Sequence, residues 1–289
     1  MQNSALLQEI VAYIEENLTE KLTLEALSGR FGISEIYIRK LFKSAFHMPI
    51  SSYIKKRKLS CSAALMLESN FRIADIAAEY GYEFPQTYIN AFKREYGLTP
   101  FQWKKSGQPL TITEKLTLDQ VIELGDKGMI LPDLVILPSL LLAGVKHTLG
   151  FTESHTLAPA KALDFWENRY PLMRHVQEKG VYYGVTKNYD KEKKRSDYYC
   201  MAHVSAKNED CHHLLLETSR YARFTYIGSH AYRELSVETA REMYRAVEAY
   251  FAQKSAAGHI FDWNLYFERV DTNVCSDDFC TMEWYIPFK

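Results

Sequence analysis

Four consecutive basic side chains, Lys55, Lys56, Arg57 and Lys58, are the first residues of this chain whose type and spacing suggest chemistry. A cluster of ammonium and guanidinium groups suits contact with phosphate oxygens. The cluster lies between Pro49 and about Ser69, where apolar residues recur at helical spacing. The sequence therefore predicts a helix of roughly 20 residues, about 30 Å long, that presents these cations. The alternative is a solvated helix surface, which is the better interpretation for at least half of the four side chains.

The cysteines and histidines carry no comparable signal. The five cysteines, at positions 61, 200, 211, 275 and 280, do not have the spacing of a zinc site. The histidines are scattered, and the sequence contains no HExxH or nucleophile-elbow motif. We therefore predict no metal, no cofactor and no catalytic site. An odd, scattered set of cysteines is typical of free thiols in a reducing cytoplasm.

The elements on either side of the basic cluster are two copies of one unit, between residues 22 and 105. In each copy a short helix ends in an aromatic residue followed by glycine, Phe31-Gly32 in the first and Tyr80-Gly81 in the second. A short turn and a second helix follow, and each copy closes on a proline. Two helices around a glycine-bearing turn are typical of the helix-turn-helix, whose second helix can lie in a DNA major groove. Two copies in register make this a strong signal.

The length of the predicted connecting helix bears on how the two copies would be used. Its roughly 30 Å is close to the roughly 34 Å between successive major-groove faces on one side of B-DNA. A single chain could therefore present two recognition helices to adjacent grooves. We expect binding as a monomer.

Together these motifs resemble the DNA-binding domain of the AraC/XylS family of bacterial transcription regulators. The matching residues are Ala26, Gly32-Ile33-Ser34, Leu41-Phe42-Lys43, Ile73–Ala77, Gly81-Tyr82, Ala91-Phe92-Lys93, Gly97 and Pro100. The resemblance implies a DNA face on each recognition helix. The predicted DNA-binding set is Glu35, Ile36, Arg39, Lys40 and Lys43 in the first copy, Pro85, Gln86, Thr87, Asn90 and Lys93 in the second, and Arg57 between them.

The resemblance also implies promoter DNA and RNA polymerase as partners, and a regulator that acts as an activator. Two positions depart from the family pattern. His47 stands where the family usually ends the helix with glycine, which makes a less favourable C-cap. Asn90 stands where related activators often carry arginine, the commonest specific reader of guanine, so we expect the second helix to read its groove weakly.

Length and composition fit a globular protein of two domains. The chain has 289 residues, 47% hydrophobic and 25% charged, which are ordinary proportions. It has no run of 18 apolar residues, and its N-terminus reads as an acidic amphipathic helix, not a signal peptide. We expect a cytoplasmic protein that does not enter the membrane. Residues 1–107 hold 14 Lys and Arg against 11 Asp and Glu, and the remainder holds 21 against 25. The basic balance of the first part suits DNA.

The pattern changes after Ser106-Gly107-Gln108-Pro109. We predict a DNA-binding domain over residues 1–107, a linker over 108–133 that is partly helical between Leu116 and Leu124, and a second domain over 134–289. In the second domain a βαββ order occurs twice, which predicts a duplicated α+β fold. The expected elements of the first repeat are Val135–Val145, Ala158–Val176, Val181–Thr186 and Tyr198–Val204. Those of the second are Tyr221–Gly228, Val237–Ala252, Asp262–Arg269 and Phe279–Pro287.

This second domain resembles the GyrI-like effector-binding domain of multidrug-sensing regulators. The matching residues are Ala143-Gly144-Val145, Tyr221, Phe224, Gly228, the helix Thr239–Phe251 and the ending Glu283–Phe288. The resemblance implies a small-molecule effector held by a glutamate among aromatic rings, an arrangement that suits lipophilic cations. The predicted ligand set is Glu283, Tyr285, Trp166, Tyr170, Tyr182, Phe224, Tyr232, Trp263 and Tyr266.

Other interpretations of the second domain stay open. Aromatic residues in strands and helices more often belong to a core than to a pocket. A family acidic position appears here as Asn264, which weakens cation selectivity and leaves a neutral amphipathic ligand open. The domain could also be a protein-interaction module. A small hydrolase, with a glutamate as general base, is the least supported alternative.

Overall fold

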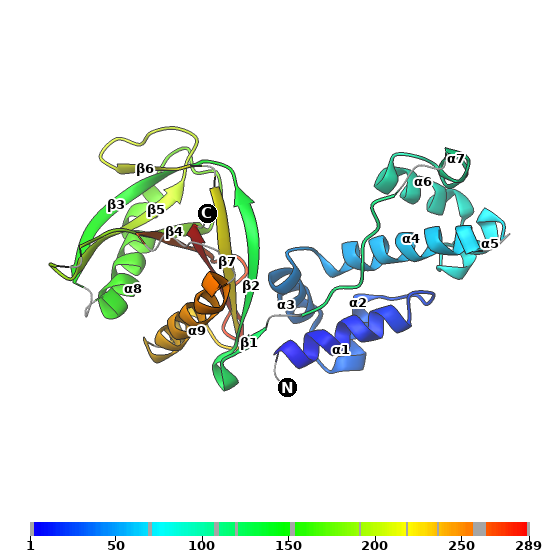
Figure 1. Cartoon of the computed structure of the whole chain (residues 1–289), viewed down its shortest axis with the longest axis horizontal. Coiled ribbons are helices and arrows are strands. Elements are labelled where there is room, and N and C mark those ends of the chain that lie inside the picture. The colour runs from blue at the N-terminus through cyan, green and yellow to red at the C-terminus, as the bar shows by residue number, and fades with distance from the viewer. Residues whose placement is uncertain are drawn as a thin grey trace. The chain divides into compact units, whose positions relative to one another are not determined.

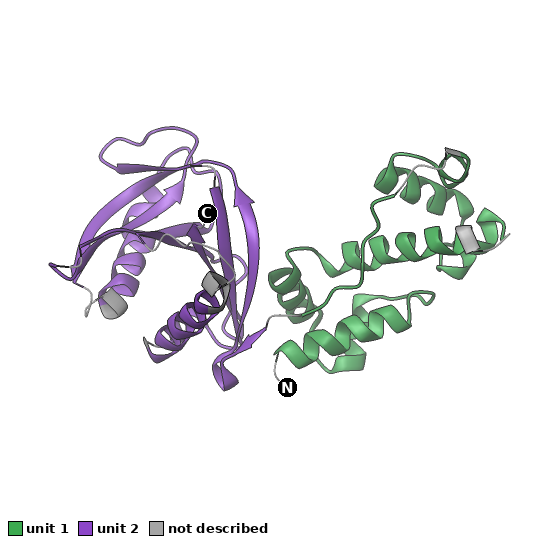
Figure 2. Cartoon of the chain, in the orientation of Figure 1, with its two compact units in different colours: residues 1–119 green, residues 120–289 purple. Residues whose placement is uncertain are grey.

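A computed structural model of the chain describes residues 3–68, 71–106, 110–118, 121–150, 154–190, 192–217, 219–235, 237–256 and 264–287. The chain divides into two compact units, residues 1–119 and residues 120–289 (Figure 2). The first unit is helical, and the second is built on an antiparallel sheet with helices. The predicted fold class, an all-α domain followed by an α+β domain, is confirmed.

The first unit contains two helix-turn-helix pairs joined by the long helix α4 (Figure 1). The first pair is capped locally: Thr23 Oγ1 accepts a hydrogen bond from the Ala26 amide, and Ser34 Oγ accepts one from the Tyr37 amide, both at 3.1 Å. Between the two helices of this pair, Gly32 has φ of 67°, which glycine adopts without a steric penalty. The helices are α1 (Asn3–Glu16), α2 (Leu24–Phe31), α3 (Glu35–Phe46), α4 (Ile50–Glu68), α5 (Ile73–Glu79), α6 (Pro85–Tyr96) and α7 (Pro100–Ser106).

The two recognition helices, α3 and α6, end differently. Both end at a left-handed residue, which is His47 with φ of 54° after α3 and Gly97 with φ of 80° after α6. A Cβ in this conformation costs roughly 1–2 kcal/mol. The C-cap of α3 is therefore the less favourable one, as the sequence predicts.

Helix α4 belongs to two separate cores. Near its N-terminus, Tyr53 packs against Phe42 of α3, with ring centroids 5.5 Å apart. From its middle to its C-terminal end, Leu59 and Met66 join a core with Tyr88 and other residues of α5, α6 and α7. We call α1–α3 with the start of α4 the first half, and α5–α7 with the end of α4 the second half. The two halves share one helix.

Residues 110–118, which we call the strap, form neither helix nor strand and run back along α4 (Figure 1). The Thr113 amide donates to Ser60 Oγ at 2.9 Å, and the Leu116 amide donates to the Tyr53 hydroxyl at 3.2 Å. Arg57 donates to the Thr113 carbonyl at 2.5 Å. Within the helix expected between Leu116 and Leu124, residues 116–118 and 121–124 are not helical, and the Leu116 amide is instead bonded to a side chain of α4.

The boundaries of the two units differ from the expected ones. The first compact unit runs to residue 119, beyond residue 107, because it includes the strap. The segment expected as a linker, 108–133, contains β1 (Ile122–Glu123), the 3₁₀ turn η1 (Gly125–Lys127) and the start of β2 (Met129–Leu137). Strand β2 pairs with β7, which lies about ninety residues further along the chain. Such distant pairing leaves no local pattern in the sequence.

The sheet of the second unit has the order β1-β2-β7-β9-β8-β4-β5-β3-β6, and its strands are antiparallel. The two repeats meet at its centre, where β4 pairs with β8. The strand expected over Val135–Val145 is divided at Pro138-Ser139 into β2 and β3. The strands are β3 (Leu140–Gly150), β4 (Val181–Asp190), β5 (Arg195–His203), β6 (His212–Leu216), β7 (Ser219–Gly228), β8 (Leu265–Asp271) and β9 (Cys280–Pro287).

The repeats exchange their outer strands. Strand β2 precedes β3 in the chain but pairs with β7 of the second repeat. Strand β6 precedes β7 but pairs with β3 of the first repeat. Each repeat thus contributes a strand to the outer part of the sheet half that the other repeat forms.

The two faces of this sheet have different cores. The helix face packs against α8 (Ser154–Asp164) and α9 (Val237–Ala256), through residues such as Phe165, Met243 and Phe224 (Figure 1). After α8 the chain continues as a π-helical turn, η2 (Phe165–Arg169), and a 3₁₀ turn, η3 (Tyr170–Leu172), so the helix ends before the expected Val176. The opposite face packs a second cluster that includes Tyr183, Phe267 and Tyr285.

Candidate nucleic-acid interface and effector site

The first recognition helix, α3, has one buried face and one exposed face. Ile38, Leu41 and Phe42 are fully buried. On the other side, Ile36 is 64% exposed, and Arg39 donates to Glu35 at 2.9 Å in an exposed ion pair. Lys43 is exposed and Lys40 is half-buried. These residues fit a surface that can meet a groove, with the guanidinium of Arg39 already oriented by Glu35.

The second recognition helix, α6, presents a less charged surface. Pro85 is its first residue, and Tyr88 and Phe92 are buried. Gln86 Nε2 donates to Asn90 Oδ1 at 3.0 Å, so each amide already satisfies part of the other's hydrogen bonding. Pro85, Gln86, Thr87, Asn90 and Lys93 are all exposed. This helix carries fewer cations toward DNA than α3 does.

Most side chains of the basic cluster on α4 already contact other groups of the protein. Lys56 pairs with Glu95 at 2.8 Å, and Lys58 Nζ donates to the carbonyls of Glu20 and Tyr80. Lys55 makes no hydrogen bond or ion pair with another residue that the structure describes. Of the four cations, Lys55 is therefore the one best placed to meet a phosphate.

Arg57 requires a correction to the predicted DNA-binding set. Its guanidinium forms an ion pair with Glu15 of α1 at 2.5 Å, and both side chains are only 13% exposed. Burial would raise the pKa of Glu15, but hydrogen bonds from Arg57 and Tyr53 outweigh burial and hold that pKa below its ordinary value. The same hydrogen bonding raises the pKa of Arg57. Arg57 joins α1, α4 and the strap, and its side chain is not available to DNA.

We expect unequal contributions from the two recognition helices. Arg39→Ala should weaken specific DNA binding by about 1–3 kcal/mol and relax base preference, as loss of a base-reading arginine does. The stability of the protein should change by less than about 1 kcal/mol, since the pair with Glu35 is exposed. Asn90→Ala should weaken binding less. Fluorescence anisotropy at fixed salt on a site selected by the wild-type protein measures both, and a larger loss for Asn90→Ala would contradict the ranking.

In the second unit, Glu283 and Tyr285 lie on the face of the sheet that is opposite to α8 and α9. The Glu283 carboxylate is 3.3 Å from Arg269 Nη1 and 3.8 Å from Arg223 Nη1, and it accepts a hydrogen bond from the Tyr285 hydroxyl at 2.9 Å. Tyr285 is buried and stacks on Phe267. The predicted grouping of Glu283 and Tyr285 with the other aromatic residues is therefore not what the structure shows.

The aromatic residues of the predicted ligand set come together on the helix face. The Trp166 ring centroid lies 4.4 Å from that of Tyr170 and 5.9 Å from that of Tyr182. The Tyr182 and Tyr232 hydroxyls share a hydrogen bond of 2.7 Å. Trp166, Tyr170, Tyr232 and Tyr266 are half-buried. Phe224 instead packs against Tyr250 and Phe251 of α9 as a core residue, and Trp263 lies outside the described residues.

The acidic residue on this face is Glu268, which the sequence analysis did not single out. It lies on β8 two residues after Tyr266, so the two side chains share a face of the sheet. The Tyr198 hydroxyl donates to Glu268 Oε1 at 2.8 Å. Burial raises the pKa of Glu268 above its ordinary value, although hydrogen bonds from Tyr198 and Trp284 oppose the rise. Among the residues that the structure describes, none forms an ion pair with Glu268.

Gly184 makes room for this carboxylate. It lies directly opposite Glu268 in the pairing of β4 with β8. A Cβ at position 184 would collide with the Glu268 carboxylate and would lie 2.6 Å from the Tyr198 hydroxyl. Because this opposition depends on the pairing of β4 with β8, which are distant in the chain, no local sequence signal identifies Glu268.

Among the described residues, no group of three or more His, Cys, Asp or Glu side chains is arranged to hold a metal ion. The five cysteines are free thiols. Over the same part of the chain, no helix combines the length and apolarity needed to cross a bilayer.

Comparison with known proteins gives a match in each unit. A family model for a helix-turn-helix domain matches residues 27–106. The right origin-binding protein of Escherichia coli is 24% identical over 243 residues, which are 79% of this chain and 80% of that protein. The HTH-type transcriptional activator AarP of Providencia stuartii is 31% identical over 104 residues, 36% of this chain and 76% of AarP. The solved structure of SAV2435 bound to tetraphenylphosphonium aligns with a TM-score of 0.43 and 17% identity, over 55% of this chain and 93% of that one.

Proposed function

This chain belongs to the AraC/XylS family of helix-turn-helix transcription regulators, and we propose that it activates transcription in response to a small amphipathic or cationic effector. The first unit would bind promoter DNA, and the second would hold the effector. A regulator of this kind would act in the cytoplasm and recruit RNA polymerase. Because one chain carries two recognition helices, it would occupy its site as a monomer.

The DNA-binding residues that we propose are those on the exposed faces of the recognition helices. They are Glu35, Ile36, Arg39, Lys40 and Lys43 on α3, Pro85, Gln86, Thr87, Asn90 and Lys93 on α6, and Lys55 on α4 in place of Arg57. Arginine and asparagine would read base edges, whereas the lysines suit phosphates. Binding should therefore fall steeply as the salt concentration rises.

The observation that carries the effector proposal is the unpaired state of Glu268. A half-buried carboxylate that has lost much of its hydration and has no cationic partner is costly to ionise, and its pKa rises as a consequence. A bound cation would supply the missing charge, and the free energy of the pair would then contribute to binding. Glu283 has no need of a bound cation, since Arg223 and Arg269 lie beside it.

The rings around Glu268 support the same chemistry. Trp166, Tyr170 and Tyr266 are half-buried on this face of the sheet, and a cation over the face of an aromatic ring gains about 0.5–2 kcal/mol. The hydroxyls of Tyr182 and Tyr198 provide polar groups that can orient a ligand. A lipophilic cation matches both the ring surfaces and the carboxylate. A neutral amphipathic ligand would use the rings alone.

The proposal is tested by removing the charge of Glu268 while keeping its shape. Glu268→Gln should weaken binding of a lipophilic cation, with tetraphenylphosphonium as the probe, by about tenfold, the scale of one charge-assisted contact. Affinity in the wild-type protein should also rise with pH through the raised pKa of Glu268, because only the ionised form attracts the cation. This pH dependence should be absent in Glu268→Gln. Isothermal titration calorimetry measures both.

Glu283→Gln is the matched control, since it makes the same change on the opposite face of the sheet. It should leave cation affinity unchanged. Equal affinities in the wild-type and Glu268→Gln proteins would remove Glu268 from the site. If neither tetraphenylphosphonium nor a neutral amphipath such as a bile acid shifts the melting temperature of the wild-type protein, the second unit is better regarded as a protein-interaction module.

A further inference from the structure

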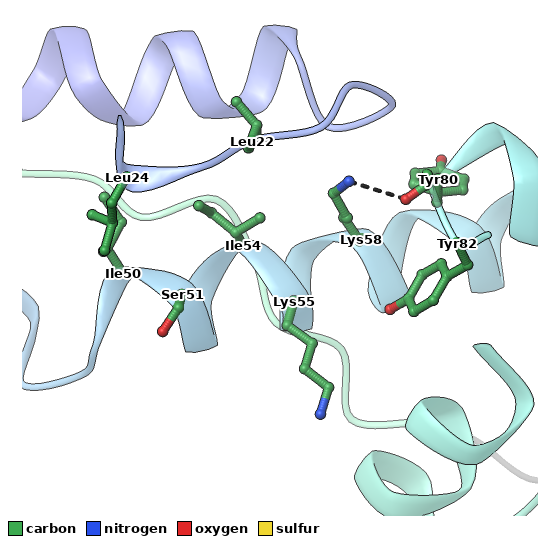
Figure 3. Close-up of a pocket in the computed structure, with 10 residues that line it drawn as sticks. Leu22, Leu24, Ile50, Ser51, Ile54, Lys55, Lys58, Tyr80 and Tyr82 are labelled. Atoms are coloured by element: carbon green, nitrogen blue, oxygen red, sulfur yellow. Dashed lines mark hydrogen bonds between the residues drawn. The ribbon is translucent and has the colours of Figure 1, made fainter. Parts of the chain in front are cut away.

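Lys58 lies at the place where the two halves of the first unit approach each other. Its ammonium group donates to the carbonyl of Glu20, in the turn between α1 and α2, at 2.8 Å. It also donates to the carbonyl of Tyr80, at the turn between α5 and α6, at 3.0 Å (Figure 3). One side chain on the shared helix thus joins a turn of the first half to a turn of the second.

The two turns lie close together at this point. Gly81, with φ of 75°, is so near that a Cβ on it would lie 3.4 Å from Lys58 Nζ and 3.6 Å from the Thr19 carbonyl oxygen. The positive φ favours glycine, whereas a Cβ at this place would make only ordinary van der Waals contacts. The contact between the turns is therefore made by backbone groups and by Lys58.

The side chains beside this contact leave an opening. A pocket of about 330 Å³ opens at the same junction. Apolar side chains of both halves line it without filling it (Figure 3). The lining residues are Leu22, Leu24, Ile50, Ser51, Ile54, Lys55, Lys58, Tyr80, Gly81 and Tyr82.

The placement of the recognition helices depends on this junction. Each half has its own core at one end of α4, so bending of α4 near its middle would swing α3 relative to α6. Lys58 lies near the middle of this 19-residue helix. Hydrogen bonds from a charged donor to both turns oppose such bending more strongly than bonds between neutral groups.

We propose that Lys58 is a positioning residue that fixes the separation of the two recognition helices and thereby the spacing between half-sites that the protein accepts. Adjacent half-sites move apart by about 3.4 Å and rotate by about 35° for each inserted base pair. A protein whose two halves are held rigidly at the junction should bind DNA with the altered spacing more weakly. A protein whose halves can move at the junction should bind both spacings with similar affinity.

The test compares Lys58→Met with Lys55→Met in the full chain, on DNA carrying the selected site or the same site with one base pair inserted between its halves. Both variants remove one cation from the rim of the same pocket, but only Lys58 joins the two turns. The wild type and Lys55→Met should both lose about tenfold in affinity on insertion, the scale of about one good base contact. Lys58→Met should bind the selected site about tenfold more weakly, as expected for loss of hydrogen bonds from a charged donor, and lose less than about threefold on insertion.

Lys58→Arg keeps donors near both carbonyls and should restore the spacing penalty. Circular dichroism establishes that each variant is folded, and affinity for an isolated half-site should be equal in Lys58→Met and the wild type. A Lys58→Met protein that is folded and keeps the full insertion penalty overturns the proposal. If Lys58→Met does not fold, the same comparison is made with Lys58→Gln, which removes the charged donor. A folded Lys58→Gln protein should show a reduced insertion penalty, and one that keeps the full penalty overturns the proposal.

Discussion

Replacing Arg57 with methionine should lower the free energy of unfolding of the first unit by about 3–5 kcal/mol, the usual cost of removing one partner of a buried ion pair. Glu15 would keep its charge without its guanidinium partner, and the Thr113 carbonyl would lose a hydrogen bond. Urea denaturation followed by far-ultraviolet circular dichroism, which reports the helical unit, measures the change. The pair stabilises the protein above the unfolded pKa of Glu15, and this contribution is lost as pH falls through the lowered folded pKa. The variant should therefore lose less stability on acidification.

Arg39→Met is the control for this prediction, because it removes an exposed arginine that pairs with Glu35. It should change the free energy of unfolding by less than about 1 kcal/mol. Arg39→Met should impair DNA binding, whereas folded Arg57→Met, assayed at low temperature, should retain its salt dependence. A stable Arg57→Met protein with a shallower salt dependence would instead return Arg57 to the phosphate-binding set.

Replacing Arg269 with methionine should lower the free energy of unfolding of the second unit by about 3 kcal/mol. Arg269 lies between Glu178 at 2.8 Å and Glu283 at 3.3 Å, so its loss leaves two half-buried carboxylates together. Burial would raise the pKa of Glu178, but hydrogen bonds from Arg269 and Tyr183 hold it below its ordinary value. The same row continues through Arg223 to Asp133 and ties β8, β9, β7 and β2 together across the sheet. Thermal and urea unfolding of the full chain report the loss.

The double variant Arg269→Met/Glu283→Gln separates the charge effect from loss of packing. Removing one of the two carboxylates that Arg269 brings together should recover part of the stability lost in Arg269→Met. Binding of tetraphenylphosphonium should be unaltered in either variant that folds, since Glu268 faces the other side of the sheet. If the double variant is less stable than Arg269→Met, electrostatics among these groups is not the cause.

The helix-turn-helix pairs could be predicted from the sequence because their determinants are local. Thr23 and Ser34 cap helices within three residues of themselves, and the glycines mark the turns. The apolar stripe of each recognition helix faces the core as its spacing indicates. The βαββ order of the second unit was also visible, since each element has its own periodicity. The comparison with AarP confirms the family for the first unit.

The partners that individual charged side chains contact could not be predicted in the same way. Arg57 lies in a basic run typical of phosphate contact, yet its partner Glu15 is 42 residues away. Glu283 and Glu268 are both strand glutamates with aromatic neighbours, and only the pairing of strands shows which of them meets arginines. The division at Pro138 likewise depends on β2 leaving its own repeat to pair with β7.

The exchange of β2 and β6 gives the second unit the geometry of a domain-swapped dimer whose two subunits are joined in one chain. In a true dimer of such repeats, folding would require two molecules to meet, and stability would depend on their concentration. Covalent joining makes the same assembly unimolecular. The repeats are consequently interdependent, because each one alone would expose a strand edge open to pairing with other chains. A break in the chain between β5 and β6 should leave two fragments that fold only in each other's presence.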